Sequence, residues 1–255
     1  MKRRIACCAL AALAPFLIAA DKPMLVPDVS ARQVQIRYSF QGGQLLLFGA
    51  IAYPDGRTPT RPADIAVVLR GPVQPILVRE KEKIAGIWMN ADSSRFRSAP
   101  SFYAVASSKP IRDLVDERTA SIYELGIHNL QLSPGGGALP ERERHFEAGL
   151  LDLRSRAGLF SENPHGVEIS SGILYRAFIS IPSQVPVGTY TAETFLIDRG
   201  HVVAVATRDI QIDKSGFERY VYLASRRDRF AYGLACIALS LGLGWAAAMA
   251  FRRRF

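Results

Sequence analysis

The chain has 255 residues, of which 49% are hydrophobic, and a formal net charge of +9. The positive charges gather beside two apolar segments, at residues 2–4, 226–229 and 252–254, so the stretch between these segments is close to neutral. A nucleic-acid-binding domain would carry its basic residues on the folded body, so this class is excluded. The stretch also lacks cysteine, which excludes disulfide and thiolate chemistry there.

Residues 1–20 have the pattern of a secretory signal peptide. A basic start precedes an apolar run, and the small residues Ala19 and Ala20 stand before Asp21. We expect cleavage after Ala20, although Ile18, three positions before the cut, leaves an uncleaved signal anchor as an alternative. Either form places the body, residues 21–215, in the periplasm.

The first half of the body predicts β-strands. Apolar and polar residues alternate over 33–40, which indicates a half-buried strand. Residues 45–53 are apolar on both faces, so we expect a central strand that is covered on both sides. Further strands are predicted at 65–69, 76–78, 87–89 and 101–106, and the charged run 79–83 at a solvated strand face or turn.

The pattern becomes helical over about 110–164. Two short helices are expected before a Gly-rich loop, and Pro140 suits the first position of a third helix. Phe146, Leu150, Leu153 and Ala157 recur at helical spacing, so they predict one apolar face.

Strands return at 167–170, 173–181, 190–197 and 202–212, with hairpin spacings between them. Tyr190, just after Pro186 and Gly188, resembles the tyrosine corner of an immunoglobulin-like sandwich. The predicted fold is therefore mainly β: an immunoglobulin-like antiparallel sandwich with a helical insertion at about 110–164. Two small abutting domains are the alternative.

Residues 230–251 contain no charge and no proline. A bilayer core of about 30 Å needs about 20 apolar helical residues, so this run predicts a transmembrane helix. A juxtamembrane helix is expected at 216–229, and residues 252–255 form a cytoplasmic tail under the positive-inside rule. Small residues four apart predict close helix packing, with a partner or in an oligomer, at Ala238, Gly242, Gly244 and Ala248.

Catalytic chemistry has little support in the sequence. The four histidines do not pair at metal-ligand spacing, and no Gly-x-Ser-x-Gly elbow or phosphate-binding loop occurs. Residues 141–147 bring carboxylates close to His145, but a solvated helix face explains them better. We therefore expect no metal, no cofactor and no enzymatic activity.

The stretch 86–103 mixes aromatic side chains with arginines in what reads as a loop, which is typical of contact sites. The candidate partner-binding residues are Trp88, Asn90, Arg95, Phe96 and Arg97. The alternative is a loop that crosses the end of the sandwich with its aromatic side chains in the core.

Several short segments carry a family resemblance: 25–28 (LVPD), 47–51 (LFGAI), 64–72 (DIAVVLRGP), 86–90 (GIWMN), 101–105 (SFYAV) and the C-terminal span. Together they resemble a family of putative transmembrane proteins typical of alphaproteobacteria. The resemblance implies a signal peptide, a periplasmic β-rich body and one inner-membrane helix. It also implies an association with sulfite-exporter-type transporters, and it brings no catalytic residues.

The preferred functional hypothesis is a single-pass inner-membrane protein whose periplasmic domain binds an envelope or transporter protein. The alternative is a periplasmic domain that binds or senses a small ligand, such as an anion held by Arg95 and Arg97. An enzyme comes third. The expected partners are the lipid bilayer and a membrane protein, and not nucleic acid.

Overall fold

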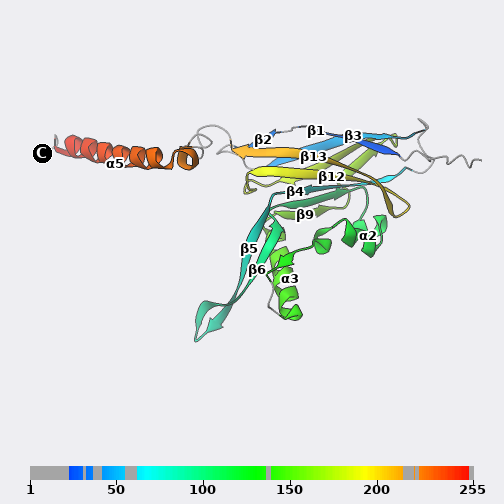
Figure 1. Cartoon of the computed structure of the whole chain (residues 1–255), viewed down its shortest axis with the longest axis horizontal. Helices are drawn as coiled ribbons and strands as arrows, with labels where there is room; N and C mark the ends of the chain where they lie inside the picture. The colour runs from blue at the N-terminus through cyan, green and yellow to red at the C-terminus, as the bar shows by residue number, and fades with distance from the viewer. Residues whose placement is uncertain are drawn as a thin grey trace, which may run out of the picture.

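The computed structural model describes residues 23–30, 33–36, 42–54, 62–135, 139–214, 221 and 224–252. The expected signal peptide, part of the juxtamembrane segment and the last three residues of the tail lie outside this description. The described chain forms a sandwich of two sheets, a third small sheet that leaves the sandwich, and a long C-terminal helix (Figure 1).

The first sheet of the sandwich has four strands, in the order β1 (Met24–Val29), β3 (Gly43–Ala52), β11 (Leu174–Ile181) and β10 (Val167–Ser170). The second has six strands, in the order β2 (Gln33–Ile36), β13 (His201–Lys214), β12 (Gly188–Asp198), β4 (Asp64–Arg70), β7 (Tyr103–Ser107) and β9 (Phe160–Asn163).

This strand order is that of an immunoglobulin-like sandwich. The first sheet corresponds to strands A, B, E and D, while β4, β12 and β13 correspond to C, F and G. All pairings are antiparallel except those of β2 with β13 and of β7 with β9. The predicted fold class is confirmed.

The tyrosine corner is present. Tyr190 is fully buried at the start of β12, and its hydroxyl donates to the Pro186 carbonyl at 2.7 Å. Its ring lies 5.9 Å from that of Phe102, centroid to centroid. Gly71 passes beside the Tyr190 ring and the Phe102 Cβ, and an added Cβ there would lie 2.6 Å from the Ser101 hydroxyl. This corner therefore fixes the chain where β4 ends and β12 begins.

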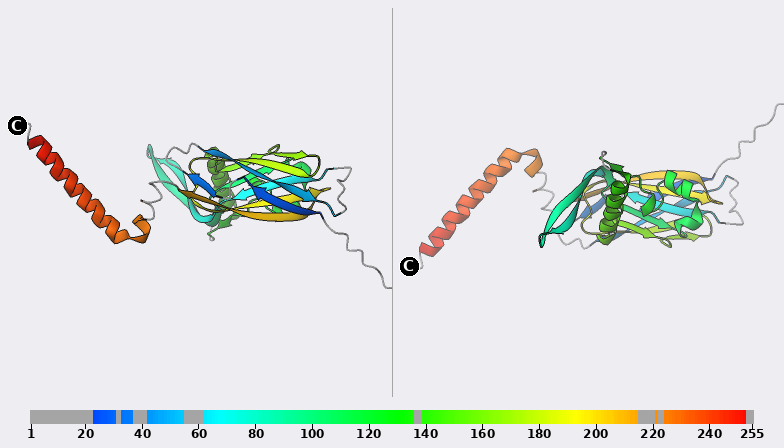
Figure 2. Two further views of the ribbon diagram at one scale, coloured as in Figure 1. Left: turned by 90° about the horizontal axis from the view of Figure 1, so that it is seen from above. Right: turned by 90° about the horizontal axis from the view of Figure 1, so that it is seen from below.

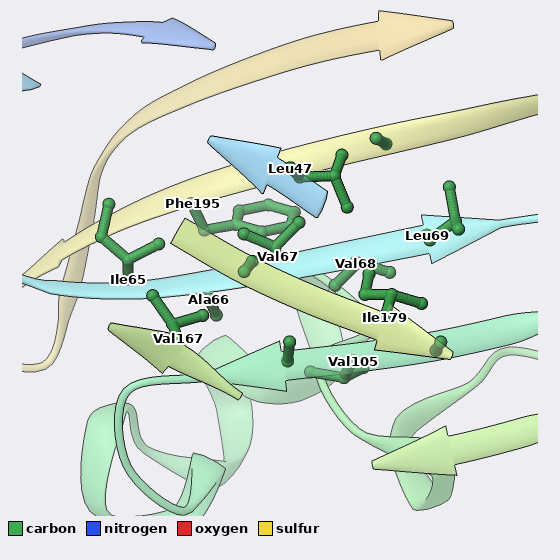
Figure 3. Packing of buried hydrophobic residues seen from close by; sticks show 14 of the residues in the cluster. Leu47, Ile65, Ala66, Val67, Val68, Leu69, Val105, Val167, Ile179 and Phe195 are labelled. Atoms are coloured by element: carbon green, nitrogen blue, oxygen red, sulfur yellow. The ribbon is translucent and has the colours of Figure 1, made fainter. Parts of the chain in front are cut away.

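The main core lies between the two sheets, where side chains of Leu47, Val67, Ile179 and Phe195 interdigitate (Figure 3). β4 is the central strand, and all five of its inner residues are buried. Apolar side chains from the helical insertion, such as Leu125, extend the same core. β4 therefore reads as an unbroken apolar run because little of it meets solvent.

The helical insertion lies between β7 and β9. It contains α1 (Ile111–Leu114), α2 (Glu117–Ile122), the 3-10 turn η1 (Ile127–Asn129) and α3 (Pro140–Arg156). Asp116 caps α2, because its carboxylate accepts from the Thr119 amide at 3.1 Å.

The stretch 86–103 is not a loop, so that interpretation was wrong, whereas the strands predicted at 76–78 and 87–89 are present as parts of longer strands. β5 (Val73–Ile84) and β6 (Ile87–Pro100) pair along almost their whole length in a hairpin that we call the arm. Ala85 and Gly86 form its turn with φ of 50° and 86°, both left-handed as a tight two-residue turn requires. The short β8 (Ser133–Pro134) pairs with β6 near its base. Figures 1 and 2 show the arm projecting from the sandwich.

A second hydrophobic cluster, separate from the main core, joins the arm to α3. Its buried members are Val78, Phe96, Ala99, Phe146 and Leu150. The predicted apolar face of α3 is only partly correct, because Leu153 is 58% exposed, whereas Leu151 packs against the main core. The apolar stripe rotates because α3 leaves the arm and meets the sandwich.

β3 also differs from expectation on one face. Its inner side chains are buried, but Phe48 on the outer face is 37% exposed. The strand was expected to be covered on both sides. Each sheet of a sandwich must be apolar on the face that packs on the core, and its other face can meet solvent. The apolar side chains on the outer face of β3 therefore do not require a second layer above them.

The C-terminal transmembrane helix is α5 (Arg229–Arg252). It is long and apolar enough to cross a membrane over Arg229–Met249, and the body buries none of this span. The helix agrees with the predicted span of 230–251.

Candidate functional site

The arm presents an unusual apolar tip. Four large side chains near its turn are exposed: Ile84 by 48%, Ile87 and Trp88 by 67%, and Met89 by 51%. Cross-strand pairing places Lys83 opposite Trp88 and Ile84 opposite Ile87. The tip therefore gathers apolar surface at the point farthest from the arm's own core.

The five candidate contact residues do not form one surface. Trp88 and Asn90 lie near the tip, about 17 to 30 Å along β6 from Arg95 and Arg97 at a strand rise of about 3.3 Å per residue. Phe96 is only 1% exposed and belongs to the second cluster, so it cannot reach a partner. Side chains alternate along a strand, which buries Phe96 and exposes the arginines on either side of it.

Arg95 and Arg97 line a surface hollow of about 470 Å³ at the base of the arm, together with Glu143 of α3 and Gly135. The Arg97 Nη2 donates to the Gly135 carbonyl at 2.7 Å, and the Gly135 amide donates to the Arg95 carbonyl at 2.6 Å. β6 thus holds two guanidinium groups on one wall of the hollow, and α3 holds a carboxylate on another. Such a site can pair with charged groups of both signs.

Two polar contacts add to the junction between α3 and the arm. The Arg142 Nε lies 3.3 Å from the Asp92 carboxylate, and the His145 Nε2 lies 3.2 Å from the Glu80 carboxylate. All four side chains are partly exposed, so these pairs contribute less to stability than the second cluster. The charged residues of 141–147 are thus not only a solvated face, because two of them face the arm.

A charged cluster that the sequence analysis missed docks the helical insertion on the sandwich. Arg70, at the end of β4, forms an ion pair with Glu124, donates from Nη2 to the Tyr123 carbonyl at 3.1 Å and lies 3.4 Å from the Glu193 carboxylate. The Tyr103 hydroxyl donates to the Glu124 carbonyl at 2.6 Å, and burial raises the pKa of Tyr103. The sequence signal that could have indicated this cluster is Arg70 itself, a charged residue directly after five apolar strand residues.

Among the described residues, no group of three or more His, Cys, Asp or Glu side chains lies close enough together to hold a metal ion. The absence of a cofactor and of enzymatic activity stays a prediction.

The small residues of α5 lie on two faces. Ala238 and Gly242 follow one side of the helix, while Gly244 and Ala248 follow a side about half a turn away, at about 100° per residue. An added Cβ at Gly242 or Gly244 would meet nothing within 4 Å in the chain itself. Gly242 and Gly244 therefore cannot share one packing face, and helix packing at either pair stays a prediction.

A family model described as "Putative transmembrane protein (Alph_Pro_TM)" matches residues 24–253. The chain belongs to this family. The match extends from β1 into the end of α5, so it covers the sandwich, the arm and the transmembrane helix together. No curated protein matches the chain closely enough to count as a relative.

Within the body, the segments that carry the resemblance have two different environments. Those in β1, β3, β4 and β7 lie in or beside the main core, whereas 86–90 forms the turn and tip of the arm. The core segments explain the sandwich. The exposed segment makes the arm the best candidate for a functional surface.

Proposed function

We propose that this protein is a single-pass inner-membrane protein whose periplasmic sandwich presents the arm to a neighbouring envelope protein. A membrane transporter of the sulfite-exporter type is the preferred partner, through the association that the family resemblance implies. The observation that carries the proposal is the arm with its own hydrophobic cluster.

The arm is built to keep its position. Phe146 and Leu150 of α3 pack against Val78 and Phe96 of the hairpin, although an isolated two-stranded hairpin is only marginally stable in water. None of these side chains belongs to the main core. A rigid projection loses little conformational entropy on binding, so the support of α3 favours a contact role.

The hollow at the base of the arm is the proposed protein contact. Arginine is enriched in interfaces because its planar group pairs with carboxylates and stacks on aromatic rings. Arg95 and Arg97 are exposed there, and Glu143 offers the opposite charge. We expect a partner segment that presents an acidic side chain to the two guanidinium groups.

Co-purification from detergent-solubilised membranes tests this proposal. We expect Arg95→Ala/Arg97→Ala to lose at least one protein that co-purifies with the parent at equal abundance. A hot-spot loss of about 2 kcal/mol weakens binding about thirtyfold. The control is Arg112→Ala/Arg199→Ala, which removes two exposed arginines of the sandwich and the insertion, away from the arm. Recovery of the same proteins with both variants would refute the proposed contact.

The membrane helix supplies a second proposed contact. Gly242→Leu and Gly244→Leu add bulk on different faces of α5, so they are compared singly and not only as a double variant. Loss of a co-purifying protein with one of them identifies the packed face. Full recovery with both would remove the helix from the interaction.

A small-anion site is the second candidate function, because two arginines line one hollow. Sulfate serves as the probe. If the hollow binds anions, replacing chloride by sulfate at equal ionic strength should raise the melting temperature of the parent more than that of Arg95→Ala/Arg97→Ala, because excluded sulfate stabilises both proteins and only the parent also binds it. Equal responses of both proteins would exclude this function.

A further inference from the structure

The base of the arm lies at the end of the sandwich that leads to the membrane. β4 and β13 both pair antiparallel with β12, so they run in the same direction and finish at the same end. From this end β4 continues through Gly71 and Pro72 into the arm. From the same end β13 continues through residues 215–228 toward α5.

The arm is long enough to reach the bilayer surface. Its β5 strand has 12 residues, which span about 40 Å at about 3.3 Å per residue. Residues 224–227 are helical, so the chain between β13 and this turn, residues 215–223, can span at most about 30 Å. In both Figure 1 and Figure 2 the arm projects beyond the end of the sandwich where β13 finishes. The tip and the start of α5 can therefore lie at the same depth.

The chemistry of the tip fits a lipid headgroup region. The register divides the tip into one face with Ile84, Ile87 and Met89, where Glu82 stands opposite Met89, and another with Trp88, Asn90 and two lysine side chains. Tryptophan prefers the boundary between headgroups and acyl chains, while lysine reaches outward to phosphate groups. Aliphatic side chains gain free energy when they leave water for the same boundary.

We infer that the tip of the arm, residues 84–89, inserts shallowly into the outer surface of the same membrane that α5 crosses. The insertion is shallow because both strand edges near the turn lack a neighbour among the described strands, and open edges do not occur in the hydrocarbon region. The chain is thus held to the bilayer at two points. Since the arm leaves the sandwich obliquely, this second contact fixes the tilt of the body and the position of the Arg95 and Arg97 hollow above the membrane.

Tryptophan fluorescence of the full chain in vesicles tests the inference. The chain has two tryptophans, so Trp245→Phe leaves Trp88 as the only emitter. The protein is reconstituted into phosphatidylethanolamine and phosphatidylglycerol vesicles, with or without bromine on the acyl chains near the headgroup. We expect bromine to quench Trp88 strongly, aqueous iodide to quench it weakly, and the emission to shift to the blue.

Two further variants provide the controls. In the Trp245→Phe background, Trp88→Phe/His201→Trp moves the emitter to an exposed position at the opposite end of β13, where iodide but not bromine should quench it. Ile84→Gln/Ile87→Gln keeps Trp88, changes only exposed side chains and adds no like charges to this cross-strand pair, so the melting temperature should stay constant while bromine quenching falls.

A Trp88 that responds to iodide and not to bromine, as the His201→Trp control does, would overturn the inference. Such a result together with a lost co-purifying protein in Trp88→Ala would instead assign the tip to a protein partner. The vesicles contain no other protein, so this outcome is independent of the proposed contact at Arg95 and Arg97. Failure of one proposal leaves the other standing.

Discussion

Shortening Phe146 to alanine tests whether the arm and the sandwich are separate stability units. Phe146 is buried on α3 and packs in the cluster that contains Phe96 of the arm. A buried Phe→Ala change costs about 3–5 kcal/mol, from lost transfer free energy and from the cavity that remains. The test asks whether this loss of stability is confined to the arm and α3 or extends to the sandwich.

The second hydrophobic cluster is small, so the loss of one large side chain can open it while the main core stays intact. It has five buried members, and a buried side chain such as Val78 or Leu150 contributes about 1.5–3 kcal/mol. Phe146→Ala therefore removes a large share of what holds the arm. Because no member of this cluster belongs to the main core, we expect the arm and α3 to open locally while the sandwich stays folded.

Hydrogen exchange of the full chain in detergent measures this difference. A loss of about 3 kcal/mol corresponds to about two orders of magnitude faster exchange in β5, β6 and α3. Exchange in β4 and β12 should change little. Leu153→Ala is the matched control, because Leu153 lies on the same helix but is exposed. If β12 lost as much protection as α3 in Phe146→Ala, the arm would not be a separate unit.

Three further predictions concern the sandwich and the topology. Gly49→Ala should lower stability by about 1–3 kcal/mol in thermal unfolding, because its Cβ would lie 2.6 Å from the Tyr175 hydroxyl and 2.5 Å from a β1 carbonyl; an unchanged midpoint would contradict this packing. Burial raises the pKa of Tyr190 from 10.0 to about 12, so the contribution of this residue to stability should be constant below pH 10 and fall toward pH 12 as the unfolded phenol ionises first. Tyr190→Phe should make this alkaline fall shallower, and an identical pH profile would refute it. A phosphatase fused after Ser215 should be active and one fused after Phe255 inactive, and the reverse would place the body in the cytoplasm.

The sequence by itself determined the features that depend on local pattern. Alternation with period two predicted strands, an apolar run between arginine clusters predicted α5, and Tyr190 after Pro186 predicted the corner of the sandwich. Each of these signals comes from residues close together in the chain. The local environment of each element, whether solvent, lipid or a neighbouring turn, selects these residue patterns. They can therefore be recognised without knowledge of contacts between distant parts of the chain.

Part of the candidate site was also recognisable, but not its arrangement. The exposed positions of Trp88, Asn90, Arg95 and Arg97 are compatible with a contact role, whereas Phe96 lies in a core that the sequence did not reveal. Reading 86–103 as a loop hid the alternation that separates Phe96 from its neighbours. Once β6 is a strand, adjacent side chains must point to opposite faces.

Only the tertiary structure decided what the arm is. The charged run 79–83 and the stretch 87–100 become strands because they pair with each other, and pairing between strands is a property of two segments, not of either alone. The same holds for α3, whose apolar side chains could have faced the sandwich. Phe146 and Leu150 face the arm because Val78 and Phe96 offer an apolar surface there, whereas Leu151 packs against the main core.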